Sequence, residues 1–192
     1  MTNIAIFASG SGTNAQRIIE YFSNNSSINI SLVLSNKADA FVLDRAKKLN
    51  KPSFVFTADQ FRNTDIVINK LIEFKIDFIV LAGFLLKVPN NIIKAFPNKI
   101  INIHPALLPK YGGKGMYGSN VHKAIIEAKE VNSGITIHFV NEEYDEGQII
   151  FQAECKILEN DTPETLAEKI HLLEFENFPK IIEEVVKKLQ II

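Results

Sequence analysis

The chain has 192 residues, of which 46% are hydrophobic and 22% are charged, and its 21 basic and 22 acidic residues give a formal net charge of −1. This composition is typical of a globular domain that can bury a core, and the charge balance argues against nucleic acid or an anionic membrane as partner. The only cysteine, Cys155, allows no intramolecular disulfide and no zinc cluster. The N-terminus lacks signal-peptide features, and the longest apolar run is too short to span a membrane. We therefore expect a cytoplasmic protein.

The first hundred residues alternate short β-branched runs with longer amphipathic segments. The predicted strands are 3–8, 28–35, 52–56, 77–83 and 99–104. The predicted helices between them are 13–24, 38–50, 63–75, with Asn63 or Thr64 as its cap, and 90–96. Nearly continuous apolar strands that alternate with helices indicate an α/β fold, with a Rossmann-like, mostly parallel sheet covered by helices on both faces.

The pattern changes after residue 100. A helix is predicted at 118–130, and 133–157 is predicted to form two strands joined by a polar turn. Segment 162–190 has the pattern of a long helix that we expect Pro179 to interrupt. Because no repeat or linker is visible, we expect a single domain over 1–192, in which the late strands add to the sheet in antiparallel fashion.

The segment "ASGSGTN" (8–14) lies between the first predicted strand and helix. Gly10 and Gly12 permit a tight turn and close approach of a ligand. The following helix offers free backbone N–H groups and the positive end of its dipole, which together favour an anion such as phosphate. A third glycine at the dinucleotide-binding position is absent, as is a Walker motif. The alternative is a tight turn that binds no ligand.

The segment "INIHPALLPK" (101–110) places Asn102 and His104 at the end of an otherwise apolar strand. Their spacing directs both side chains to one side of the strand, at the sheet edge where ligands of open α/β folds bind. An amide can donate to a developing oxyanion, and an imidazole can move protons near neutral pH. The alternative is a structural asparagine beside a hydrogen-bonded histidine.

The segment "HFVNEEYDEGQ" (138–148) places acidic residues between the last two predicted strands. Asp145 is the candidate to meet His104, where a carboxylate raises the pKa of the imidazole, orients it or holds a water molecule. A solvated turn is the alternative, and we favour it for Glu142, Glu143 and Glu146.

The remaining histidines carry weaker signals. His138 lies inside an apolar strand, where we expect a hydrogen-bonded core histidine. His122 and His171 lie on predicted helices without a distinguishing motif. The spacing of the four histidines predicts no metal site.

Taken together, these segments resemble the folate-dependent glycinamide ribonucleotide (phosphoribosylglycinamide) formyltransferases. The Asn-Ile-His-Pro segment followed by Leu-Leu-Pro is typical of folate-dependent formyltransferases and hydrolases, and the glycine-rich opening narrows the resemblance to the ribonucleotide branch. The matching segments are "IAIFASGSGTNAQ", "LVLSNKADAFVLDRA", "IVLAGFLLKVP", "IINIHPALLPKYGGKG" and "GITIHFVNEEYDEGQIIFQ".

The resemblance implies transfer of a formyl group from 10-formyltetrahydrofolate, as cosubstrate, to the amine of the ribonucleotide in de novo purine biosynthesis, without a metal. It implies small-molecule substrates and a monomer or homodimer. It assigns phosphate binding to 1–100, and folate binding and catalysis to 101–192. The implied catalytic residues are His104, Asn102 and Asp145. The implied ribonucleotide site is Gly12, Thr13, Asn14 and Glu174. The implied folate site is Leu85, Leu86, Lys87, Val88, Asn102, Asn141, Glu142, Glu143, Tyr144 and Asp145.

The chain departs from the family pattern in the folate segments. Leu85-Leu86 stands where many relatives have Met-Arg, Asp145-Glu146-Gly147 stands where many have Asp-Gly-Gly, and Thr64 stands where an arginine is frequent. A 10-formyltetrahydrofolate hydrolase is the nearest alternative, although these relatives usually carry an additional N-terminal domain. Methionyl-tRNA and sugar-amine formyltransferases usually carry a C-terminal extension. A non-catalytic phosphate or folate binder would not need the three catalytic residues, and a nicotinamide oxidoreductase would need the third glycine.

Overall fold

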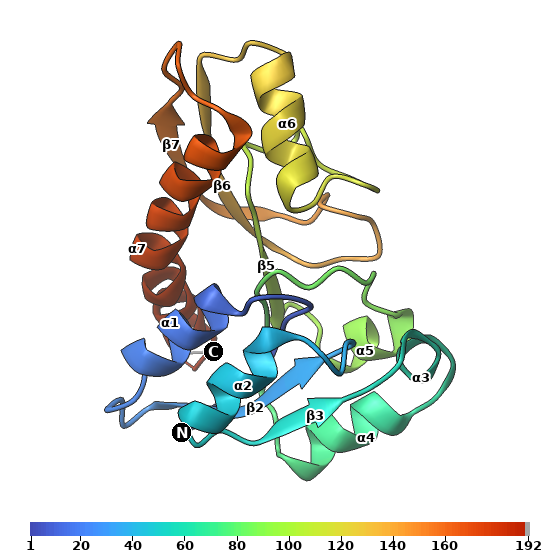
Figure 1. Cartoon of the computed structure of the whole chain (residues 1–192). Helices are drawn as coiled ribbons and strands as arrows, with labels where there is room; N and C mark the ends of the chain where they lie inside the picture. Colours follow the sequence, from blue (N-terminus) through green and yellow to red (C-terminus); the bar gives the residue numbers. More distant parts are fainter. Residues whose placement is uncertain (191–192) are drawn as a thin grey trace.

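The structure is a computed structural model that describes residues 1–190. Its centre is a seven-stranded sheet with the order β3-β2-β1-β4-β5-β6-β7 (Figure 1). Strands β1 to β5 pair in parallel, whereas β6 and β7 join in antiparallel fashion. The predicted α/β class, with antiparallel strands added late in the chain, is confirmed. The strands are β1 (Thr2–Phe7), β2 (Ile28–Ser35), β3 (Ser53–Val55), β4 (Phe78–Leu81), β5 (Ile100–His104), β6 (Asn132–Phe139) and β7 (Ile149–Lys156).

Helices cover both faces of the sheet because the buried strands are apolar on both sides. In β1, Ile4 and Ile6 belong to one hydrophobic core, and Ala5 and Phe7 belong to the other. The first core is closed by α1 (Thr13–Tyr21), α2 (Phe41–Lys48), α6 (Ser119–Glu127) and α7 (Pro163–Gln190). The second core is closed by α3 (Ala58–Asn63), α4 (Ile66–Glu73) and α5 (Asn90–Ala95).

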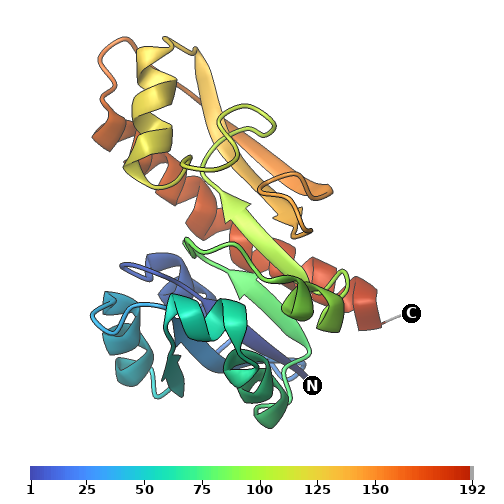
Figure 2. The same cartoon turned by 90° about the vertical axis from the view of Figure 1, so that its right-hand side faces the viewer.

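Helix α7 is continuous through Pro179, so the predicted interruption is wrong. Proline lacks an N–H group and leaves the carbonyl one turn earlier without its helical partner. Here the carbonyl of Phe175 accepts a hydrogen bond of 3.3 Å from Nε of Arg17, in α1. A neighbouring helix thus satisfies the freed carbonyl, and α7 extends along the sheet from α6 to α1 (Figures 1 and 2). No helix within residues 1–190 is long and apolar enough to cross a membrane.

The predicted helix at 63–75 starts later than expected, and a separate helix precedes it. Helix α3 was not predicted, although Thr57 and Gln60 form a reciprocal capping box at its start. The residue at the start of α4 is Asp65, not Asn63 or Thr64. The hydroxyl of Thr64 nevertheless accepts a hydrogen bond of 3.3 Å from the N–H of Ile66, the first residue of α4, and donates to the carbonyl of Gln60 at the end of α3.

Candidate functional site

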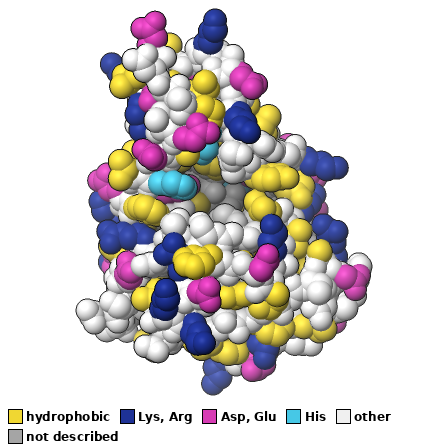
Figure 3. Space-filling view, viewed as in Figure 1, with side chains coloured by type: hydrophobic (Ala, Val, Ile, Leu, Met, Phe, Trp, Pro, Cys, Tyr) yellow, Lys and Arg dark blue, Asp and Glu magenta, His cyan; other side chains and the backbone are white. Residues whose placement is uncertain are grey.

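A cavity of about 630 Å³ opens at the carboxyl ends of β1, β4 and β5. Figure 3 shows a hollow in the middle of this face of the molecule, with histidine side chains near its rim. This is the sheet edge at which open α/β folds bind ligands. The segments that line it include Ser9–Asn14, Ala82–Leu85, Asn102–Pro105, Gly113–Gly118 and Tyr144–Asp145, together with Lys37, His122, His171 and Glu174.

The glycine-rich loop ends at Gly12, which precedes the first turn of α1 with a φ of 72°. A side chain at Gly12 would also place its Cβ 2.4 Å from Cγ2 of Val42, so both conformation and space require glycine. No side chain caps α1 at this position, and its first N–H groups have no partner within the helix. With Thr13 and Asn14 lining the cavity, the loop offers an anion site of the kind predicted from the sequence.

Glu174 is brought to this loop from α7. It is 5% exposed, and its Oε2 accepts hydrogen bonds of 2.8 Å from Nδ2 of Asn14 and from Nδ1 of His171. The hydrogen bond to Glu174 raises the pKa of His171, which favours its charged form. The four residues predicted for the ribonucleotide therefore lie on one side of the cavity.

His104 lies at the end of β5 and is 3% exposed. Its Nε2–H donates to the carbonyl of Tyr111 at 2.8 Å, which directs Nδ1 toward Oδ2 of Asp145 at 3.5 Å. Burial lowers the pKa of His104, and the opposing effect of Asp145, although present as expected, is smaller. The imidazole is therefore neutral at pH 7, and its Nδ1 can accept a proton.

Asp145 remains charged although it is largely buried. Burial alone would raise its pKa, but His138, His104 and the N–H of Gly113 together hold that pKa below its usual value. The N–H of Gly113 donates to Oδ2 at 2.9 Å. A charged carboxylate is thus fixed beside a neutral imidazole.

Asn102 is the third predicted catalytic residue, and it is connected to Asp145 through His138. Its Nδ2 lies 3.1 Å from Nε2 of His138, which lies 3.5 Å from Oδ1 of Asp145. Nδ1–H of His138 donates to the carbonyl of Phe139 at 2.8 Å and thereby fixes the ring. His138 is buried and hydrogen-bonded as predicted, and in addition it links Asn102 to Asp145.

The residues predicted for folate divide into two groups. Leu85, Asn102, Tyr144 and Asp145 line the cavity. The remaining ones do not line it. Val88 is buried and Leu86 packs against the second core, whereas Asn141 and Glu142 are exposed. Lys87 lies 3.8 Å from the carboxylate of Glu143 and over the ring of Tyr144. The contacts of Lys87 join the 85–88 segment to the 141–145 segment.

Several residues of the cavity carried no signal in the sequence. Ser9 connects the glycine-rich loop to the folate segment, because its Oγ donates to Asn36 and accepts from the N–H of Leu85. His122 and His171 line the cavity although their helices gave no motif. Lys37 belongs to the quoted "SNKADAF" segment, but that segment did not identify it as a cation of the cavity.

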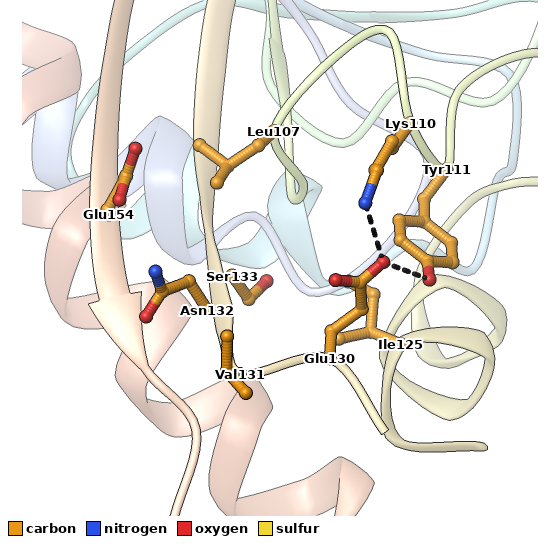
Figure 4. A pocket seen from close by; sticks show the side chains of 9 residues that line it. All are labelled: Leu107, Lys110, Tyr111, Ile125, Glu130, Val131, Asn132, Ser133 and Glu154. Carbon is orange, nitrogen blue, oxygen red and sulfur yellow. Dashed lines mark hydrogen bonds and ion pairs between the residues drawn. The ribbon is translucent and has the colours of Figure 1, made fainter. Parts of the chain in front are cut away.

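A second pocket, of about 270 Å³, lies between α6, β6 and the loop after β5 (Figure 4). Its main polar groups pair with each other, since Oε1 of Glu130 accepts hydrogen bonds of 2.9 Å from both Lys110 and the hydroxyl of Tyr111. The carbonyl of Tyr111 is the group that accepts from His104. These contacts therefore support the loop that fixes the histidine. Residues 1–190 contain no cluster of three or more His, Cys, Asp or Glu arranged to hold a metal ion.

Comparison with known proteins identifies the family. Residues 2–182 match the model of the formyl transferase family. The chain belongs to this family. It is 41% identical over 96% of its length to the phosphoribosylglycinamide formyltransferase, chloroplastic, of Arabidopsis thaliana, and 39% identical over 95% of its length to the phosphoribosylglycinamide formyltransferase of Haemophilus influenzae. The family resemblance predicted from the sequence is confirmed.

The lengths of these formyl transferases differ. The chain spans 66% of the Arabidopsis protein, slightly less than two thirds, and 86% of the Haemophilus protein. The fold agrees with a crystal structure of phosphoribosylglycinamide formyltransferase from Bacillus halodurans, with a TM-score of 0.88 and 34% identity over 98% of this chain and 97% of that one.

Proposed function

We propose that this chain transfers the formyl group of 10-formyltetrahydrofolate to the amine of N1-(5-phosphoribosyl)glycinamide, a step of de novo purine biosynthesis. The observation that carries the proposal is the meeting of Asn102, His104 and Asp145 in a cavity that also contains the anion-binding loop at Gly12. A phosphate at that loop anchors one end of the acceptor, while the other end reaches the catalytic residues. The names of the two relatives reported above support phosphoribosylglycinamide as the acceptor and formyl as the transferred group.

In this proposal the acceptor amine attacks the formyl carbon and forms a tetrahedral intermediate with a negative oxygen. Asn102 has an amide group in the cavity that can donate to this oxygen. Its contact with His138 holds the amide before the substrate arrives, so that little reorganisation is needed during the reaction. Breakage of the bond between the formyl carbon and N10 of the folate then completes the transfer.

The proton that leaves the amine has a defined acceptor. Nδ1 of His104 is unprotonated in the neutral imidazole and lies beside Asp145, whose charge stabilises the imidazolium formed when the proton arrives. The same imidazolium then delivers a proton to N10 as it leaves. His104 thus serves as base and then as acid, and Asp145 stabilises its charged form.

The remaining assignments follow from the same proposal. The chain acts as a single formyltransferase domain, in which 1–100 bind the phosphate and 101–192 supply the folate site and the catalytic residues. Each site also takes residues from the other half: Glu174 joins Gly12, Thr13 and Asn14 around the ribonucleotide, and segment 85–88 joins segment 141–145 around the folate. We expect a cytoplasmic monomer or homodimer that acts on small molecules without a metal, and neither on nucleic acid nor at a membrane.

An acceptor-dependence assay tests this function. We expect purified protein to consume 10-formyltetrahydrofolate rapidly only when the ribonucleotide is present, with one formylated ribonucleotide formed for each formyl group lost, as measured by mass spectrometry. Release of formate at the same rate without the acceptor would identify a hydrolase and contradict the proposal.

A further inference from the structure

His122 is a buried residue of the cavity whose Nδ1 lacks a hydrogen-bond partner in the described part of the chain. It lies in α6 and is 5% exposed. No group within residues 1–190 forms a hydrogen bond with its Nδ1. An unpaired polar atom in a buried position is unfavourable for the free protein, and such atoms are rare unless a function requires them.

The surroundings of His122 are those of the ribonucleotide side. Helix α6 packs on α7, the helix that carries Glu174 and His171, and both of these residues act electrostatically on the ring of His122. Burial lowers the pKa of His122, so the ring is neutral at pH 7 and presents a hydrogen-bonding nitrogen, not a positive charge. A neutral ring is suited to a hydroxyl or amide group and poorly suited to a phosphate.

We propose that His122 contacts the acceptor, and that its Nδ1 forms a hydrogen bond with the ribose or glycinamide part of the bound ribonucleotide. This inference rests on the proposed function. If the phosphate lies at the Gly12 loop and the amine at His104, the ribose and glycinamide extend between Glu174 and His104. His122 lines the same cavity, and Glu174 acts electrostatically on its ring. The bound acceptor thus satisfies the nitrogen that the protein leaves unpaired.

The test compares three variants of His122 by direct titration of the ribonucleotide and of the folate in a calorimeter, and by steady-state kinetics. His122→Leu removes the nitrogen, His122→Asn places an amide near the position of Nδ1, and His122→Gln places one near Nε2. We expect His122→Leu to weaken ribonucleotide binding about tenfold and to raise its KM similarly, which is the typical effect of one lost hydrogen bond. Folate affinity is expected to change less than about twofold, and His122→Asn to retain ribonucleotide affinity better than His122→Gln.

Thermal stability separates this role from a structural one. Because Nδ1 is unpaired in the free protein, we expect His122→Leu to melt at the same temperature as the wild type or higher. Lys123→Leu, an equal change at the exposed next residue of α6, serves as the matched control and should leave both affinities unchanged.

Three outcomes would overturn the inference. They are an unchanged ribonucleotide affinity in His122→Leu, an equal loss of ribonucleotide and folate affinity with a lower melting temperature, and better retention by His122→Gln than by His122→Asn. The wild-type acceptor assay keeps the two proposals apart. If wild-type protein transfers no formyl group to the ribonucleotide, the proposed function fails, whereas a competent wild type with an unaffected His122→Leu variant rejects only the role of His122.

Discussion

Asp145 has a backbone φ of 56°, in the left-handed region that aspartate enters more readily than most residues. Two residues later, the turn between β6 and β7 has no space for a side chain, because a Cβ on Gly147 would lie 1.7 Å from the carbonyl oxygen of Phe139. The turn therefore sets the direction of the Asp145 side chain. From this position the carboxylate contacts His104, His138 and the N–H of Gly113.

Replacement of Asp145 by asparagine tests its role at constant size. The amide oxygen can still accept from Gly113, but the negative charge that stabilises protonated His104 is lost. We expect kcat to fall by about a hundredfold or more, within the range typical of acid–base groups, while circular dichroism shows an unchanged fold. Glu146→Gln, one residue away and exposed, is the matched control and should retain full activity. Near-normal turnover in Asp145→Asn would contradict the assigned role.

For single residues, the sequence predicts the direction of those side chains that follow from the alternation of a strand. Asn102 and His104 alternate with Ile101 and Ile103, which face the first core, so both polar side chains point to the opposite side of β5. The unpaired nitrogen of His122 was not predictable. It depends on how α6 packs against α7, and no local pattern in the sequence carries that information.

Among the elements, the turn between β1 and α1 positions the anion site. Helix α2 holds it through two hydrogen bonds: the carbonyl of Gly10 accepts from the N–H of Val42, and the carbonyl of Ser11 accepts from Nε of Arg45. Helix α2 thus packs directly on the loop, and at Gly12 the remaining space admits no side chain larger than a hydrogen atom.

Two alanine substitutions in this loop should therefore have very different effects. Gly12→Ala places a methyl group against Val42 at a positive φ, and we expect the free energy of unfolding to fall by about 2 kcal/mol or more. Gly10→Ala has no atom within 4 Å of the new Cβ and no positive φ, so we expect a change within about 1 kcal/mol of the wild type. Urea denaturation measures both. Equal effects of the two substitutions would show that the loop is not confined as described.

The errors in the helix predictions have physical causes. Pro179 was expected to end a helix, but the compensating donor, Arg17, lies 162 residues earlier in the chain, so no local rule could include it. Helix α3 is only six residues long, and short helices depend on tertiary packing for stability, here through buried Phe61. Strands β1, β2 and β4 were easier to predict because their residues are mostly apolar and buried on both faces.

In the whole molecule, α7 joins the two halves of the site. It packs on α6, β6 and β7 and also on α1, whose Asn14 and Tyr21 donate to Glu174 and Glu183. The cavity lies between these halves and encloses His104 and His122 as buried, neutral groups. The stability of the whole fold is therefore coupled to the protonation of its histidines.

Between pH 7 and pH 5 we expect the free energy of unfolding to decrease, and the sign follows from the direction of each shift. Burial lowers the pKa values of His104 and His122 below the ordinary value of about 6.5, so the unfolded chain takes up protons first as the pH falls. The contribution of these two histidines to the free energy of unfolding is complete above their pKa in the unfolded chain. It is lost as the pH falls toward their pKa in the folded protein. His171 acts oppositely, because Glu174 raises its pKa and its contribution is complete at the acidic end. Asp145, whose lowered pKa affects stability only below about pH 4, does not contribute in this window.

Urea denaturation at several pH values, with two single variants, separates these contributions. In His122→Leu the decrease between pH 7 and pH 5 should be smaller than in the wild type, because one group that resists protonation is gone. In His171→Leu the decrease should be larger, because the group that gains stability on acidification is gone. Loss of the buried His122 can change the slope by at most about 1.4 kcal/mol per pH unit, and loss of the half-exposed His171 by less. Identical slopes in the wild type and both variants would mean that the protonation of these two residues does not differ between the folded and unfolded states.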